Sequence, residues 1–419
     1  MRPADFVLLH ARELITCAGT VPRRGTDQSR LDSIADGALA AHEGRVVYAG
    51  PSSDLQNHVQ PVPGAAIHDV REHVILPGFV DPHTHAVFAG DRRHELRRRL
   101  AGESYADIAR SGGGIVETVR ATRNADDATL VTATRQRLDE MLACGTTTCE
   151  IKSGYGLDVV SELKLLRAIK VLADVHPMTI VSTFLGAHEV PPEHRHQREQ
   201  YVDLVCREMI PAVAAERTAE WCDVFCETDV FTPEESRRIL EAGAAAGLKP
   251  RIHADELGPS GGALVAASVG ARSADHLVFV TPAGIEALAD RQVTATLLPV
   301  AAFYLKLARS APARELIAKG VPVALATDVN PGGGFSPSMP FAMALGCFRM
   351  DMTFEEAVIA STINAAWSID RAADVGSLEP AKLADAVVVR GDAVNLLRVG
   401  APAIAAVVKK GRLVHGSLG

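Results

Sequence analysis

Residues 73–85 read HVILPGFVDPHTH, an apolar run that ends in two histidines one residue apart. The run is typical of a buried strand, and side chains at i and i+2 of an extended chain point to the same side. His83 and His85 would therefore present two imidazoles to one point, as two metal ligands do. The same spacing occurs at 194–196, but within PPEHRHQREQ, which is charged and has no strand pattern. We interpret that second pair as solvated.

A rhythm of short β-rich segments, each followed by a helical stretch, starts with this run. The segments lie at residues 73–85, 145–156, 179–190, 221–227, 249–257, 272–280, 293–300 and 321–332. Several are apolar throughout, as expected for parallel strands that are covered on both faces. Strands that alternate with helices indicate βαβ units, and eight of them predict an α/β fold with a (β/α)8 TIM-like barrel. The alternative is a doubly wound open sheet, which would normally carry a glycine-rich nucleotide turn after an early strand.

The two ends of the chain lack the strand–helix rhythm. Residues 1–72 contain strand-like pieces separated by turns, and residues 376–419 return to that style. The simplest arrangement is a small β-sandwich domain formed from both termini, with a barrel of residues 73–375 inserted between them. The glycine-containing stretch within 103–120 follows no strand, and we interpret it as an active-site loop and the candidate lid.

Composition narrows the class of protein. The 419 residues are 47% hydrophobic, enough for one large core and a smaller second core. The net charge of −8 and the lack of a basic stripe argue against nucleic acid as a partner. No apolar run approaches the roughly 20 residues that a membrane span needs, and no apolar signal segment stands at the start. With seven scattered cysteines, which we interpret as reduced thiols, these features predict a cytoplasmic protein without a membrane role.

The residues able to do chemistry follow the carboxyl ends of the predicted strands. They are His83, His85, Tyr155, His188, His253, Glu256, His276, Asp328 and Asn330. In a barrel these ends meet at one mouth, where catalytic residues gather. A single histidine is more often a hydrogen-bonded core or surface residue than a ligand, so the prediction depends on the pattern across strands. The histidines outside it, interpreted as structural or solvated, are His10, His94, His176, His194, His196 and His415.

Three imidazoles and one carboxylate in this group could hold a metal ion. They are His83, His85, His253 and Asp328. This donor set suits zinc or iron and does not suit Ca²⁺ or Mg²⁺. A water on such an ion loses a proton near neutral pH, and Glu256 could take that proton and deliver it to a leaving nitrogen. A binuclear site would normally add a bridging lysine on the fourth strand, which here ends in FCE, so we expect one Zn²⁺ or Fe²⁺/Fe³⁺ ion per subunit.

These residues resemble the amidohydrolase superfamily, in particular its mononuclear branch. The shared pattern is HxH after the first strand, His-x-x-Glu at the fifth, His at the sixth and Asp at the eighth. Longer stretches, FVDPHTHAVFAGDR, EIKSGYGLD, TFLGAHEVPPE and ATDVNPGG, are similar to the imidazolonepropionase family, in order over most of residues 73–390. The resemblance implies metal-dependent hydrolysis of the ring C–N bond of 4-imidazolone-5-propanoate to N-formimidoyl-L-glutamate, a step of histidine degradation.

The resemblance also implies a role for each residue. The metal ligands would be His83, His85, His253 and Asp328. Catalysis would fall to Glu256, His276 and Asp328, which handle protons and polarise the carbonyl group. The substrate would be contacted by Arg92, Tyr155, His188, Glu256, Asn330, Gly332 and Gly333. Many relatives read NPGSSP where this chain reads NPGGGFSP, so the hydroxyl donor at position 333 is lost and only backbone N–H contacts remain for the product. Arg92 would grip the propionate, and its neighbour Arg93 is the alternative.

Two other classes of function stay open at this stage. A related deaminase of a purine or pyrimidine heterocycle would release ammonia and would need no arginine for a carboxylate. A non-catalytic scaffold would have lost ligands, and all four are present here. The expected partner is a small anionic heterocyclic substrate, and the assembly we expect for a barrel enzyme of this kind is a homodimer.

Overall fold

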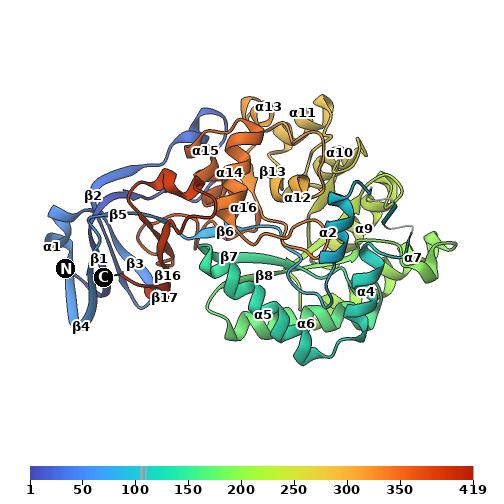
Figure 1. Ribbon diagram of the computed structural model, residues 1–419, viewed down its shortest axis with the longest axis horizontal. Helices are drawn as coiled ribbons and strands as arrows, with labels where there is room; N and C mark the ends of the chain where they lie inside the picture. Colours follow the sequence, from blue (N-terminus) through green and yellow to red (C-terminus); the bar gives the residue numbers. More distant parts are fainter. Residues whose placement is uncertain (104–106, 109–110, 419) are drawn as a thin grey trace.

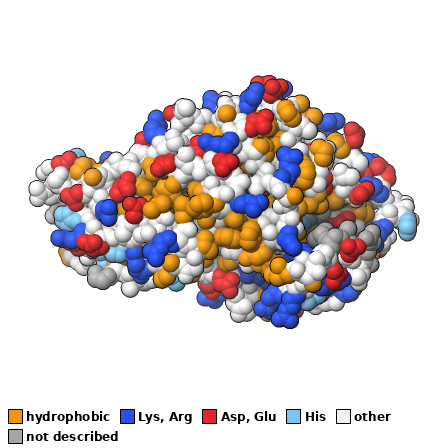
Figure 2. Space-filling model, turned by 45° about the horizontal axis from the view of Figure 1, so that its top comes forward, with side chains coloured by type: hydrophobic (Ala, Val, Ile, Leu, Met, Phe, Trp, Pro, Cys, Tyr) orange, Lys and Arg blue, Asp and Glu red, His pale blue; other side chains and the backbone are white. Residues whose placement is uncertain are grey.

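The computed structural model describes residues 1–103, 107–108 and 111–418, and it divides them between two sheets. Figure 1 shows one sheet at the end of the molecule that carries both termini, and the barrel with its helices at the other end. On the face in Figure 2, basic and acidic side chains are interspersed, and hydrophobic side chains gather in a band across the middle. None of the helices in the described residues combines the length and apolar character needed to span a lipid bilayer.

Eight parallel strands follow one another around the barrel in chain order, which confirms the predicted fold class. They are β6 (Phe79–Asp81), β7 (Thr146–Lys152), β8 (Thr179–Ala187), β9 (Trp221–Cys226), β11 (Ile252–Ala254), β12 (Ser273–His276), β13 (Thr294–Leu297) and β14 (Val323–Leu325). A two-residue strand, β10 (Lys249–Pro250), also pairs with β9. Each of the eight predicted segments contains one of these strands. Both faces of these strands are buried, which explains why their sequences are apolar runs.

Helices alternate with the strands and cover the barrel. The longer ones are α4 (Ile115–Asn124), α5 (Asp127–Ala143), α6 (Val159–Val175), α9 (Pro233–Ala245), α11 (Pro282–Arg291) and α14 (Met339–Met350). The shorter ones include α2 (Arg93–Leu100), α10 (Gly262–Val269), α12 (Pro299–Tyr304), α15 (Phe354–Ala360) and α16 (Ile363–Ser368). The start of α9 shows how local sequence fixes a boundary. Thr232 and Glu235 form a capping box around Pro233, which satisfies N–H groups that the first helical turn leaves unpaired.

The seam between the first and last barrel strands is joined by side-chain and loop contacts. The Asp81 carboxylate accepts hydrogen bonds from the Thr327 backbone N–H (3.1 Å) and hydroxyl (2.5 Å). Just beyond them, the N–H of Asp328 donates to the carbonyl of His83 at 3.1 Å, and that of His85 donates to Val329 at 3.0 Å. These contacts fix the HxH segment against the segment that carries Asp328.

The second sheet is mixed and combines strands from both ends of the chain. It contains β1 (Arg2–Ile15), β2 (Ser33–His42), β3 (Arg45–Pro51), β4 (Val59–Asp69), β5 (His73–Pro77), β15 (Ala386–Arg390), β16 (Ile404–Lys409) and β17 (Arg412–Gly416). The sequence grouped β5 with the barrel, but it pairs with β1 and β15. The chain crosses to the barrel at Gly78, where a Cβ would collide with the side chain of Thr147.

Candidate active site

The residues singled out at the strand ends surround one pocket at the mouth of the barrel. It has a volume of about 180 Å³. Its lining includes Arg92, His85, Tyr155, His188, His253, Glu256, His276, Asp328, Asn330, Gly332 and Gly333. His83 is fully buried beside this lining, with its ring centroid 4.5 Å from that of His253. The structure therefore brings every candidate residue to one place.

Three histidines form a compact group of nitrogen donors. One ring nitrogen each from His83, His85 and His253 lie within 4.8 Å of one another. The Nε2 atoms of His85 and His253 are 3.2 Å apart, close to the roughly 3.3 Å that a tetrahedral ion with bonds of about 2.0 Å would impose. Burial holds the pKa of His83 and of His85 well below the usual range, so both rings are neutral and keep the lone pair that a metal needs.

Asp328 adds a carboxylate to this group. Its Oδ1 atom lies 3.5 Å from Nε2 of His85 and 3.8 Å from Nε2 of His83. In the described part of the chain, this oxygen and Nε2 of His83 are buried without a hydrogen-bond partner. Unpaired buried polar atoms cost free energy, and burial also raises the pKa of Asp328 well above its usual value. A cation between these atoms would pair with them and would stabilise the charged carboxylate, so the donors fit a zinc or iron ion.

Carboxylates behind the histidines fix which nitrogen faces the pocket. Nδ1 of His83 lies 2.6 Å from Asp275, and Nδ1 of His253 lies 3.0 Å from Asp223. Because a carboxylate accepts, each Nδ1 carries the proton, and each Nε2 is left as the donor to a metal. Neither aspartate was singled out from the sequence. The available signal was a charged residue inside a strand that is otherwise buried.

Glu256 and His276 form a pair on another side of the pocket. Oε1 of Glu256 lies 3.4 Å from Nδ1 of His276. Burial, reinforced by the nearby Glu227 carboxylate, raises the pKa of Glu256 to about 8, whereas burial holds the pKa of His276 well below its usual value. Glu256 can therefore carry a proton at neutral pH beside a neutral imidazole.

Both His276 and Asp328 have left-handed backbone conformations, with φ of 77° and 53°. Such conformations are costly for residues with a side chain and cluster at functional sites, because the surrounding structure must hold them in place. His276 is the last residue of β12, Asp328 follows β14, and both residues line the pocket. Backbone strain is therefore a second, independent observation that indicates a functional role for His276 and Asp328.

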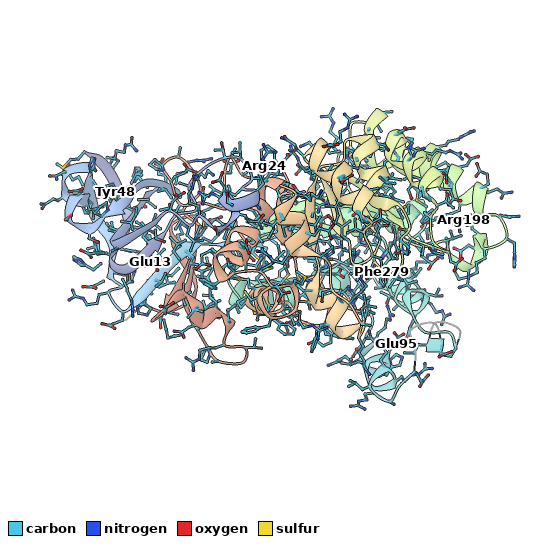
Figure 3. The ribbon with its side chains drawn as sticks, turned by 90° about the horizontal axis from the view of Figure 1, so that it is seen from above. Glu13, Arg24, Tyr48, Glu95, Arg198 and Phe279 are labelled. Atoms are coloured by element: carbon cyan, nitrogen blue, oxygen red, sulfur yellow. The ribbon has the colours of Figure 1, made fainter. Side chains whose placement is uncertain are left out.

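The structure distinguishes the two neighbouring arginines. Arg92 is 4% exposed, lines the pocket and pairs with Glu95 at 2.7 Å, whereas the Arg93 side chain is 81% exposed and pairs with Asp91. Glu95 also accepts the backbone N–H of Gly114 at 2.6 Å. Figure 3 shows Glu95 at the barrel end of the molecule, away from the terminal sheet that carries Tyr48. Of the two arginines, Arg92 is therefore the one that lines the pocket.

An aromatic group forms the wall next to the histidine cluster. The ring of His188 stacks on that of His85, with centroids 4.9 Å apart and planes 18° apart, and Tyr155 lies 5.3 Å from His188. Nδ1 of His188 lies 3.0 Å from the carbonyl oxygen of Gly154, so Nδ1 donates and Nε2 is an acceptor. Burial lowers the pKa of His188 to about 3, which keeps this ring neutral.

Asn330 organises the glycine-rich turn after β14. Its Oδ1 accepts the N–H groups of Gly332 (2.8 Å) and Gly333 (2.5 Å), and its Nδ2 donates to the carbonyl of Asp328 at 2.8 Å. The N–H of Gly333, which the sequence suggested as a product contact, is thus used inside the turn. A Cβ on Gly332 would lie 2.6–2.9 Å from the guanidinium atoms of Arg92, so this glycine makes room for the arginine.

The remaining expectations concern the lid and the other histidines. Within 103–120, residues 104–106 and 109–110 lie outside the described part of the chain, while Ile115 at the start of α4 lines the pocket. The second HxH pair, at 194–196, is absent from the pocket lining, as expected. His94 lies near Glu95 and Glu117, but its side chain is 52% exposed on the outer surface.

Comparison with known proteins agrees with this geometry. The model of the amidohydrolase family matches residues 91–415. The imidazolonepropionase of Symbiobacterium thermophilum is 48% identical over 99% of this chain and 98% of its own length, and that of Geobacillus kaustophilus is 49% identical over 93% and 92%.

Solved structures share the fold at much lower identity. An adenosine deaminase from Xanthomonas campestris with bound zinc has a TM-score of 0.72 at 15% identity, covering 98% of this chain and 93% of that one. The guanine deaminase of E. coli has a TM-score of 0.72 at 18% identity, covering 98% and 99%. Identity this low establishes the architecture alone, whereas the near full-length relatives establish the family. The chain belongs to the amidohydrolase family, in the group of the imidazolonepropionases.

Proposed function

We propose that this chain hydrolyses the ring C–N bond of 4-imidazolone-5-propanoate to N-formimidoyl-L-glutamate, in histidine degradation. Its relatives of 42–49% identity carry the imidazolonepropionase name. The proposal rests on three features that occur together in one pocket: a cluster of neutral histidines, a protonated carboxyl group and a buried arginine. A small anionic heterocycle needs all three.

One zinc or iron ion would be held by four residues. They are His83, His85, His253 and Asp328. When bound, the ion would supply an activated water and a positive charge opposite the scissile carbonyl. The protein's own part is to keep the imidazoles neutral and correctly oriented, which the burial of the rings and the carboxylates behind them support.

Glu256 would move the proton. Its carboxyl group lies at the pocket wall, and its raised pKa lets it exchange a proton with water and with the departing ring nitrogen near neutral pH. His276 is placed beside it, and in the described part of the chain Nε2 of His276 is buried without a hydrogen-bond partner. An N–H at this position would stabilise negative charge on the carbonyl oxygen of the substrate.

Arg92 would bind the propionate, while Tyr155 and His188 would contact the ring. A guanidinium group matches a carboxylate in a planar, two-hydrogen-bond geometry. The ion pair with Glu95 holds the arginine in the pocket wall, which lowers the entropy lost when the substrate binds. Since the net charge of −8 gives an anion no long-range attraction, this local contact has to supply the recognition.

The test is turnover of freshly generated imidazolone propionate, followed by loss of its ultraviolet absorbance before and after chelation. Metal content and released ammonia would be measured in the same samples. We expect decay that needs about one ion per chain and releases no ammonia. Glu256→Gln should keep the metal and lose turnover. A protein that carries metal but leaves this substrate intact would refute the proposal, and ammonia release from a heterocyclic amine would establish the deaminase alternative.

A further inference from the structure

A cluster of charged side chains lies behind the histidines and is fully buried. Lys152, at the end of β7, points its ammonium nitrogen at Glu150 (2.9 Å) and Asp223 (2.8 Å), with Asp275 at 3.9 Å. Arg251 supplies a second cation, 3.1 Å from Asp275. All five side chains are 0% exposed. Burying so many charges is expensive, so the cluster requires a reason beyond stability.

The cluster is continuous with the proposed metal site. Asp223 accepts from His253 through Oδ1 and faces Lys152 through Oδ2. Asp275 accepts from His83 through the same oxygen that faces Arg251. Each aspartate therefore contacts one proposed ligand and one buried cation. A lysine was expected on the fourth strand only if the site held two metals, and here the lysine comes from the second strand.

The Lys152 ammonium group is surrounded by carboxylates, as a bound metal ion would be. Three carboxylates face two cations in the cluster. Removing the ammonium would leave two negative charges uncompensated, which is the charge of one divalent ion. Oxygen atoms of Glu150 and Asp223 lie 2.9 and 2.8 Å from the ammonium nitrogen, so each would move by less than about 1 Å to reach bonding distance to an ion at that point.

We propose that the Lys152 ammonium occupies the place of a second metal ion and so restricts the site to one. Lys152 is a positioning residue here, because it acts through Asp223 and Asp275 and reaches neither the pocket nor the substrate. The inference rests on the proposed metal site. It explains how this chain can keep three carboxylates behind the histidines and still act through a single ion.

The test compares metal content in three proteins: wild type, Lys152→Met and Lys409→Met. Lys409 is the matched control, because it is also buried and paired with one aspartate, Asp385 at 2.6 Å, but lies in the terminal sheet. Each protein would be loaded with excess Mn²⁺ or Zn²⁺, desalted and analysed for metal per chain. Electron paramagnetic resonance of the Mn²⁺ form would then report whether two ions are spin-coupled.

We expect one ion in wild type and in Lys409→Met, and a twofold higher content with a spin-coupled signal in Lys152→Met. One ion, or none, in Lys152→Met would overturn the inference, since the lysine would then exclude nothing. Absence of metal from wild type would instead refute the proposed metal site. If Lys152→Met unfolds without metal, it should refold in excess divalent ion with two ions bound, and failure to do so would equally overturn the inference.

Discussion

Gly332 and Gly333 are adjacent, yet the structure predicts opposite results for the same substitution. A Cβ on Gly332 would lie 2.6 Å from Nη1, 2.8 Å from Cζ and 2.9 Å from Nη2 of Arg92. A Cβ on Gly333 would meet its nearest neighbours, Leu305 and Asn330, at 3.5 and 3.7 Å, which is ordinary contact. Neither glycine has a left-handed φ, so alanine costs backbone strain at neither position.

The displacement forced by Gly332→Ala sets the size of the effect. To restore a contact of about 3.4 Å, the Arg92 guanidinium must shift by roughly 0.8 Å, and misplacement on the order of 1 Å can cost 100-fold in rate. Overpacking of this kind costs about 1–3 kcal/mol, which corresponds to roughly a 5- to 150-fold rise in KM. The end of the arginine can yield, so the loss should fall on substrate binding more than on folding.

The assay is steady-state hydrolysis of imidazolone propionate by wild type, Gly332→Ala, Gly333→Ala and Gly333→Ser, with thermal unfolding of each. We expect a raised KM for Gly332→Ala alone, and a melting temperature close to that of wild type. Gly333→Ala should stay within about twofold of wild type, because nothing has to move. Equal effects at the two positions, or an unchanged KM in Gly332→Ala, would refute the assignment of Arg92 to the substrate carboxylate.

Three further outcomes follow from the site. Glu256→Gln should abolish turnover and stabilise the metal-free protein. As the pH rises from 4.5 to about 8, the carboxyl group loses its proton in the unfolded state but keeps it in the folded state. The free energy of unfolding of the wild type, but not of the variant, therefore falls by up to about 5 kcal/mol. Urea unfolding at pH 5 and pH 8 measures this, and a difference between the two proteins that does not grow with pH would contradict it. Arg92→Ala should raise KM, whereas Arg93→Ala should leave it unchanged, because only Arg92 faces the pocket. Chelation should lower the melting temperature in calorimetry, since an ion that binds only the folded state stabilises it; loss of metal at constant melting temperature would count against a site in the barrel core.

The sequence predicted the barrel strands well and one boundary poorly, for a physical reason. Parallel strands covered on both faces read as apolar runs, so each was visible from local composition. The run at 74–80 has no polar side chain, yet β5 joins the terminal sheet and β6 joins the barrel. The division at Gly78 depends on its close approach to Thr147, a contact between residues far apart in the chain. No local pattern contains that information.

The same distinction applies to the site. The pocket residues were visible because they follow strand ends, where a barrel gathers its chemistry. Asp223, Asp275 and Lys152 lie within the strands, and their meaning depends on which neighbours they face across the barrel. Arg92 and Arg93 are indistinguishable in sequence, whereas in the structure Arg92 precedes α2 and is buried, and Arg93 begins α2 with its side chain exposed.

The seam of the barrel and the proposed metal site are one structural unit. His83 and His85 lie on the segment after β6, and Asp328 lies on the segment after β14, so an ion held by them would bridge the first and last strands. The Asp81–Thr327 contact joins the same two segments directly below. Closure of the barrel thus places the carboxylate opposite the imidazoles before any ion arrives. The left-handed backbone conformation of Asp328 is strained, and the hydrogen bond from its N–H to the carbonyl of His83, across the seam, stabilises it. The contacts that close the barrel thus also stabilise the geometry of the proposed metal site.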